Sequence, residues 1–135
     1  MKRVVLDTNV FISGIFWKGL PREIIDLGRE RKIEIITSNE IVAEIRDKLI
    51  NKFHLSAEEA DFFIFDILTY ARVSEISFRV KVIKDDPEDD KFIECAISCG
   101  AEYIVSGNHH LVDLSSYKGV QILKPDQFLS KINKK

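Results

Sequence analysis

The chain has 135 residues, an apolar share of 45% and a formal net charge of −2. This length and composition suit a globular protein with a real core, and we expect residues 1–135 to form a single domain. The near-neutral charge excludes a protein that attracts nucleic acid through an overall positive field. No stretch is long enough to cross a membrane and no signal peptide is recognised, so we expect a cytoplasmic protein.

Predicted strands and helices alternate along the chain. Short apolar runs predict strands at 2–7, 33–36, 80–83, 103–105 and 120–123. Helical periodicity predicts helices at 8–17, 20–31, 38–52, 57–70, 88–99 and 125–132. This alternation is typical of an α/β fold, in which helices cover both faces of a mostly parallel sheet.

Local signals mark several helix ends. Thr37 and Glu40 form one capping-box pattern, with Thr37 as the expected cap, and Ser56 and Glu59 form a second. Gly100 is placed to end the helix predicted before it.

Cys95 and Cys99 lie four residues apart on a predicted helix. No further Cys or paired His stands near them to complete a zinc site, so we interpret them as small buried side chains. His109 and His110 are adjacent, and we expect them at the surface.

Acidic and amide side chains occur close to the ends of predicted strands. Asp7 follows the apolar run Val4-Val5-Leu6 directly, and Asn108 follows the strand at 103–105. Asp90 falls in the first turn of the helix opened by Pro87, and Glu44 lies one turn into its helix. Ligands of an open α/β sheet bind beyond the carboxyl ends of its strands, which favours a shared site for these side chains.

Crowded carboxylates indicate a divalent cation. Mg²⁺ and Mn²⁺ prefer oxygen ligands, and two such ions about 4 Å apart stabilise both oxygens of a phosphodiester displacement. Carboxylates that repel one another stay ionised when a cation neutralises them. Thr8 and Asn9 could support the site with a hydroxyl and an amide.

Each candidate also has an ordinary structural interpretation. Asp7 could cap the following helix, and Glu44 could pair with Lys48 one turn away. Asp-Asp-Pro-Glu-Asp-Asp at 85–90 supplies acids that the start of a helix favours, with Asp86 as a cap. A phosphatase with Asp7 as nucleophile is a further alternative, although Asn9 stands where that chemistry usually wants a second Asp.

Together, these segments resemble the PIN domain, and most closely its branch related to the VapC toxins of toxin–antitoxin pairs. The resemblance rests on V-V-L-D-T-N-V at 4–10, on Glu44, on D-D-P-E-D-D-K-F-I-E-C-A at 85–96 and on A-E-Y-I-V-S-G-N-H-H-L at 101–111. It implies a three-layer α/β/α sandwich with a central, mostly parallel sheet. It also implies a ribonuclease that depends on Mg²⁺ or Mn²⁺.

Carried over by position, the resemblance assigns the metal ligands to Asp7, Glu44 and Asp90. The fourth family position, usually Asp in a Ser-Gly-Asp run, is Asn108 here, and Ser106 begins that run. The second Asp of the run is replaced by His110, so the chain lacks two of the family's negative charges. These departures leave open a catalytically weakened PIN-like module that binds RNA or a partner.

The same resemblance implies three partners: an RNA substrate, a small cognate antitoxin that covers the acidic site, and a second copy of the chain. The helix at 57–70 carries Phe62, Phe63 and Phe65 over more than one face. Such a helix is either deeply buried or part of a subunit contact, which is compatible with a homodimer.

Overall fold

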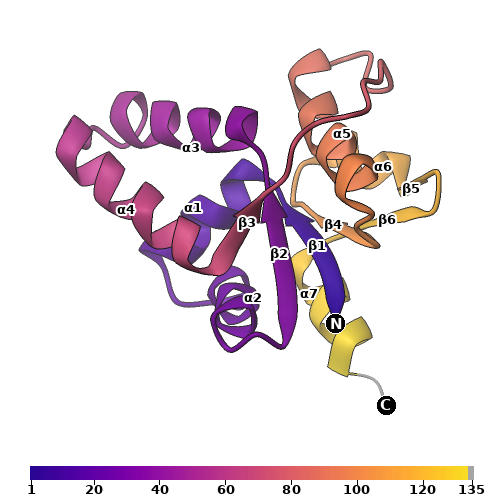
Figure 1. The fold of residues 1–135 in the computed structure, drawn as a ribbon, viewed down its shortest axis with the longest axis horizontal. Coiled ribbons are helices and arrows are strands. Elements are labelled where there is room, and N and C mark those ends of the chain that lie inside the picture. Colours follow the sequence, from indigo (N-terminus) through magenta and orange to yellow (C-terminus); the bar gives the residue numbers. More distant parts are fainter. Residues whose placement is uncertain (134–135) are drawn as a thin grey trace.

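The computed structural model describes residues 1–133 and shows a six-stranded sheet with helices around it (Figure 1). The strands are β1 (Lys2–Leu6), β2 (Ile33–Thr37), β3 (Ala71–Val73), β4 (Tyr103–Val105), β5 (Ser116–Tyr117) and β6 (Val120–Leu123). The helices are α1 (Thr8–Phe16), α2 (Leu20–Arg29), α3 (Asn39–Asn51), α4 (Ala57–Tyr70), α5 (Asp90–Cys99), α6 (His109–Leu114) and α7 (Pro125–Asn133), with a 3₁₀ turn η1 (Pro87–Asp89) before α5.

The sheet confirms the predicted α/β class with mostly parallel strands. Its order is β3-β2-β1-β4-β6-β5, and only the β5–β6 pair is antiparallel. β1 lies between β2 and β4, with Val5 beside Ile36 on one side and beside Ile104 on the other. The carboxyl ends of these three strands therefore meet at one edge of the sheet.

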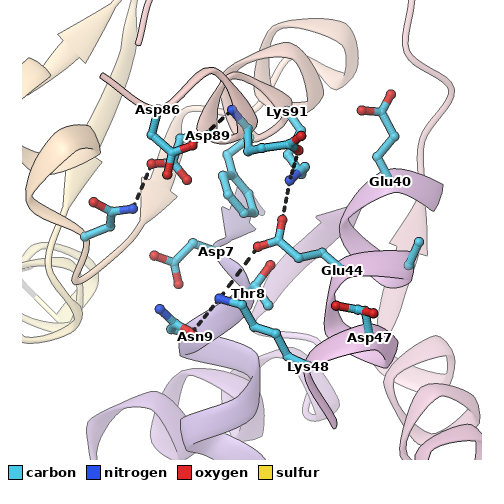
Figure 2. A pocket seen from close by; sticks show the side chains of 14 residues that line it. Asp7, Thr8, Asn9, Glu40, Glu44, Asp47, Lys48, Asp86, Asp89 and Lys91 are labelled. Carbon is cyan, nitrogen blue, oxygen red and sulfur yellow. Dashed lines mark hydrogen bonds and ion pairs between the residues drawn. The ribbon is translucent and has the colours of Figure 1, made fainter. Parts of the chain in front are cut away.

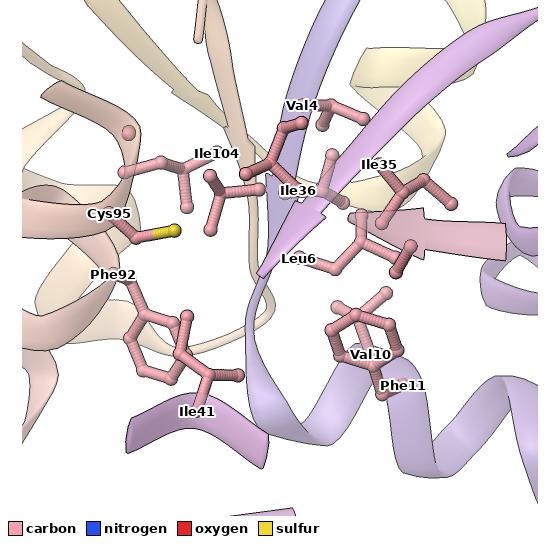
Figure 3. Packing of buried hydrophobic residues seen from close by; sticks show 14 of the residues in the cluster. Val4, Leu6, Val10, Phe11, Ile35, Ile36, Ile41, Phe92, Cys95 and Ile104 are labelled. Carbon is pink, nitrogen blue, oxygen red and sulfur yellow. The ribbon is translucent and has the colours of Figure 1, made fainter. Parts of the chain in front are cut away.

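Helices cover both faces of this sheet and form the three-layer sandwich that the family resemblance implied. α5 packs against β1, β2 and β4, whereas α2 packs against β2 and α7, and α7 packs against β6. Val4, Val5 and Leu6 of β1 are all fully buried, as a strand covered on both faces requires. Figure 3 shows side chains of β1, β2, α1 and α5 packed together in this core. Cys95 and Cys99 are buried free cysteines, as predicted.

Most of the predicted helix ends are confirmed. The Ser56 hydroxyl accepts a hydrogen bond from the Glu59 backbone N–H, and the Glu59 carboxylate accepts one from Ser56 N–H, which completes the capping box of α4. Gly100 ends α5 in the left-handed conformation, with φ of 71°. The prediction that Thr37 caps α3 is wrong, because Thr37 is the last residue of β2 and Ser38 accepts from Ile41 N–H instead.

Residues 74–86, which we name the strap, differ most from prediction. The strand predicted at 80–83 is absent from this part of the described chain. Three side chains one turn apart on α5 hold the strap instead: Asp90 accepts from Val82 and Ile83 N–H, Glu94 from Val80 N–H, and Ser98 from Ser77 N–H. These acceptors satisfy four backbone N–H groups of the strap that a neighbouring strand would otherwise have to pair.

Several short elements carry too little sequence signal to be predicted. β3 is the edge strand beside β2, β5 pairs with β6, and α6 follows Asn108. The helix predicted from residue 88 begins as η1, and Asp86 caps it by accepting from Glu88 N–H. Among residues 1–133, no helix combines the length and the apolar character that crossing a membrane requires. That residues 1–135 form one domain stays a prediction.

Candidate functional site

The site lies where the chain direction across the sheet reverses. From β1 the chain continues to β2 and β3 on one side, whereas β4 and β6 lie on the other. Such a switch point leaves a crevice beyond the carboxyl ends of the two central strands. Here these strands are β1 and β4, and the residues that follow them are Asp7 and Ser106. Asp7 N–H still donates to Val105 O at 3.0 Å, so the sheet pairing itself holds the two residues together.

Asp7 is 3% exposed and uses both carboxylate oxygens. Oδ1 accepts from Val10 N–H at 2.8 Å and caps α1, and Oδ2 accepts a short hydrogen bond from the Ser106 hydroxyl. Burial raises the pKa of Asp7 above its ordinary value, although the hydrogen bonds from Ser106 and Val10 act in the opposite direction. Each carboxylate oxygen has a second lone pair, so the capping role leaves Asp7 able to bind a cation.

A pocket of about 680 Å³ opens beside Asp7 (Figure 2). Seven of its residues carry carboxylates and two are lysines. The lining residues are Asp7, Thr8, Asn9, Glu40, Ala43, Glu44, Asp47, Lys48, Asp86, Glu88, Asp89, Lys91, Phe92 and Asn108. They come from α1, α3, the end of the strap, η1, α5 and the residues before α6. The pocket is therefore strongly acidic, unlike the near-neutral chain as a whole.

A line of hydrogen bonds joins Asp7 to a second acid across the pocket. The Ser106 hydroxyl, which donates to Asp7, accepts from Asn108 N–H at 2.9 Å. The Asn108 side-chain amide in turn donates to Asp89 Oδ2 at 2.8 Å. Asn108 Oδ1 accepts from His110 N–H and caps α6. Asn108 thus orients Asp89 and uses its own oxygen locally.

The structure brings Asp89 to the pocket and directs Asp90 elsewhere. Both residues are 7% exposed. Asp89 lines the pocket, and its pKa is raised by burial first and by the nearby charge of Asp86 second. The Oδ1 atom of Asp90 accepts from Val82 N–H at 3.1 Å and from Ile83 N–H at 2.9 Å, so this residue fastens the strap to α5. The family resemblance selects Asp90 from this run as a metal ligand, and that assignment stays a prediction; in the structure, the residues of 85–90 that line the pocket are Asp86, Glu88 and Asp89.

Glu44 lines the pocket from α3 and already has positively charged partners. Lys91 Nζ donates a short hydrogen bond to Glu44 Oε2, and Lys48 Nζ lies 3.8 Å from Glu44 Oε1 (Figure 2). Burial acts to lower the pKa of Lys91, but the bonds to Glu44 and Glu88 outweigh it and raise that pKa. Lys48 also donates to Asn9 Oδ1 at 3.3 Å. The Lys48 pair matches the ordinary interpretation of Glu44, whereas the partner Lys91 was not predicted.

The pocket offers the carboxylate oxygens that a divalent cation prefers, but these acids are too far from one another to bind one ion together. Within residues 1–133, no three His, Cys, Asp or Glu side chains lie close enough together to hold a metal ion. Thr8, only 2% exposed, lines the pocket beside Asp7, and its hydroxyl oxygen is buried without a hydrogen-bond partner. A hydrated ion next to Asp7 would supply the polar partner that this hydroxyl lacks. Binding therefore requires side chains such as Glu44 to move toward the ion.

Known proteins include one similar in sequence and one similar in fold to this chain. "Uncharacterized protein MJ1680" of Methanocaldococcus jannaschii is 37% identical over 120 residues, which cover 83% of this chain and 74% of that protein. A chain in the crystal structure of VapBC2 from Rickettsia felis, bound to a DNA fragment from its promoter, superposes with a TM-score of 0.65. That match covers 90% of this chain and 97% of the other at 14% identity, so it supports the fold alone.

The model of one protein family matches most of the sequence. It is described as the PIN domain, and the match spans residues 3–110, from β1 to the first turn of α6. This range contains Asp7, Glu44, Asp89 and Asn108 and so includes the acidic pocket. The chain therefore belongs to the PIN domain family, as its sequence motifs indicated.

Proposed function

We propose that this protein is a divalent-metal-dependent ribonuclease that hydrolyses RNA phosphodiester bonds and acts as the toxin of a toxin–antitoxin pair. One observation carries the proposal: an acidic pocket lies at the switch point of a PIN-domain sheet, with the buried Asp7 at its base. Carboxylates gathered in this way lower their mutual repulsion most effectively by binding Mg²⁺ or Mn²⁺.

The proposed ligands are Asp7, Glu44 and Asp89. Asp89 takes the role that the sequence suggested for Asp90, because Asp89 lines the pocket and Asp90 is engaged by the strap. Asn108 and Ser106 orient Asp89 and Asp7 through their hydrogen bonds. A divalent ion held there would activate a water molecule and neutralise charge on the phosphate.

The remaining pocket residues would position RNA. Lys48 stands at the pocket wall with a side chain that is 31% exposed, and its ammonium can contact a backbone phosphate without reading sequence. Thr8 would hydrogen-bond to water near Asp7, and Asn9 would hold Lys48 in place. These roles concern binding and orientation, so their loss should weaken cleavage less than the loss of Asp7.

The test is cleavage of single-stranded RNA with Mg²⁺ or Mn²⁺ by the wild type and by Asp7→Asn. Asn keeps an oxygen that can cap α1 but removes the charge, so the variant should fold and lose about 100-fold or more in rate. A chelator should abolish wild-type cleavage. Cleavage that survives both the chelator and the substitution would exclude this mechanism.

A second candidate is a PIN-like module that binds RNA or a partner without cleaving. Asn108 supplies no negative charge, and Glu44 is already neutralised by Lys91 and Lys48, which favours this alternative. The two candidates separate in one assay, because the module would bind RNA without turnover at any Mg²⁺ or Mn²⁺ concentration.

We also propose a cognate antitoxin and a homodimer. The VapBC2 neighbour is a complex whose chain shares this fold, which supports an antitoxin partner here. Phe62 and Phe65 on the outer face of α4 are 68% and 70% exposed, and exposed aromatic side chains of this size are typical of protein contacts. Phe63, in contrast, packs edge-on against Phe16 with ring centroids 5.8 Å apart.

A further inference from the structure

Lys91 is an unusual lysine because it is almost completely buried beside the acidic pocket. It is 8% exposed and is the second residue of α5, one position from Asp90 and two from Asp89. Lysine is rarely buried to this degree, since removing its charge from water is costly unless partners replace the water. The surroundings of its ammonium group therefore need an explanation.

Three groups from separate elements surround that ammonium. Its Nζ donates to Glu44 Oε2 of α3 and to Glu88 Oε2 of η1, the second at 3.3 Å. The same Nζ lies 5.6 Å from the centroid of the Phe92 ring, which is within the range of a cation–π contact. Glu88 is highly exposed, with a side chain that is 84% accessible, so the Glu44 pair is the more important of the two.

The ammonium thus does for Glu44 what a bound cation would do. Without Lys91, the Glu44 carboxylate would face the other acids of the pocket with the more distant Lys48 as its remaining positive neighbour in the described structure. With Lys91 in place, the Glu44 carboxylate is turned toward α5 and neutralised. The same contact joins α3 to α5 across the pocket (Figure 2).

We propose that Lys91 is a resident counter-cation, which competes with the divalent ion for Glu44 and must be displaced before Glu44 becomes a ligand. This inference rests on the proposed function, because it assigns Glu44 to the metal-bound state. It explains why the acids of the pocket stand apart while Lys91 holds one of them. It also makes Lys91 a regulator of metal occupancy, whose ion pair sets the concentration of metal that the site requires.

The test measures Mn²⁺ binding to the whole chain, from the electron paramagnetic resonance signal of free Mn²⁺, at one fixed pH and ionic strength. Lys91→Gln removes the partner that holds Glu44 and should lower the Kd for Mn²⁺ about tenfold, because Glu44 then no longer has to leave an ion pair before it binds the metal. Lys91→Arg keeps the charge and should stay near the wild-type Kd. Lys81→Gln, at an exposed strap position, removes the same net charge and should change Kd less than about twofold.

A double-mutant cycle with Glu44→Gln shows whether the effect acts through Glu44. In the Glu44→Gln background, Lys91→Gln should change Kd less than about twofold, because the shared partner is already gone. An equal tightening in both backgrounds would mean a general charge effect and would overturn the proposal.

A second measurement uses the wild type and needs no variant that could unfold. Acetylation of lysines by an N-hydroxysuccinimide ester, followed by peptide mass spectrometry, reports whether each ammonium is accessible. Lys91 should react several-fold faster with saturating Mn²⁺ than with a chelator, whereas Lys81 should react equally in both. An unchanged Lys91 rate would overturn displacement.

The outcomes distinguish this proposal from the function on which it rests. If the wild type binds Mn²⁺ and Asp7→Asn abolishes binding, but Lys91→Gln leaves Kd unchanged, the Lys91 proposal fails and the metal site stands. If binding is absent, or is unaffected by Asp7→Asn, the proposed metal site itself fails, and the counter-cation proposal fails with it.

Discussion

At two junctions, which we call corners, an acid stands at the start of a helix. The direction of the acidic side chain follows from the local sequence at the first corner but not at the second. At the first corner, β1 runs into Asp7, which caps α1 and lines the pocket with the same carboxylate. At the second, the strap runs through η1 into α5, and two adjacent acids make different contacts. Asp89 lines the pocket, and Asp90 binds the strap backbone.

The difference comes from what fixes the direction of each side chain. Asp7 follows a strand that is paired on both sides, and its own N–H donates to Val105 O, so sheet register decides where it points. The second corner is a 3₁₀ turn, closed by Asp89 N–H donating to Asp86 O at 3.0 Å. Successive side chains of such a turn point about 120° apart, so neighbouring acids face different surroundings.

The largest expected difference between Asp89 and Asp90 is in the rate of RNA cleavage. Asp89→Asn should lower the rate of metal-dependent RNA cleavage about 100-fold, since it removes a proposed ligand charge. Asp90→Asn should change the rate less than about threefold, because the Asn oxygen can still accept from the strap. Measured rates in the opposite order would assign the metal to Asp90 and remove the distinction between the two acids.

The next effect is on stability, where substitution of Asp90 should cost more than substitution of Asp89. Asp90→Ala leaves the N–H groups of Val82 and Ile83 without their acceptor, which should lower the free energy of unfolding by roughly 1–3 kcal/mol. Asp89→Ala should cost less, because the Asn108 side-chain amide that it leaves without an acceptor lines the open pocket. Urea unfolding of both variants in chelator tests this, and equal losses would contradict a strap-holding role for Asp90.

A smaller effect concerns pH at the first corner. Burial raises the pKa of Asp7 above the ordinary value of 3.8, so its contribution to stability is fully present below that value and is lost as pH rises through the raised pKa. Asp7→Asn cannot ionise. In chelator, its unfolding free energy relative to wild type should therefore increase as pH rises above about 4. A difference that stays constant with pH would mean that Asp7 titrates normally.

The smallest expected effect on the fold lies outside both corners, on α4. Phe65→Glu changes a side chain that is 70% exposed, so unfolding free energy should shift by no more than about 0.5 kcal/mol. If α4 forms the homodimer contact, light scattering should show the mass falling to that of a monomer. Phe63→Glu is the matched variant that should destabilise the fold, because Phe63 packs on Phe16. An unchanged mass for a folded Phe65→Glu would exclude this dimer contact.

The sequence alone predicted the parts of the molecule that local rules control. The alternation of elements, the Ser56–Glu59 capping box, the Gly100 helix end and the apolar run before Asp7 all depend on neighbours within a few residues, and the structure confirms them. The family resemblance combines several such segments in order. The match of the PIN domain model to residues 3–110 confirms it.

Only the tertiary structure decided which acids of the run 85–90 line the pocket, why the strap is not a strand, and what neutralises Glu44. These answers depend on contacts between separate segments: Asn108 holds Asp89, α5 holds the strap, and Lys91 on α5 holds Glu44 on α3. A local pattern shows that a carboxylate exists but not which donor it meets. Hydrogen bonds and ion pairs depend on distance in space, and that distance is set only when the sheet brings separate segments together.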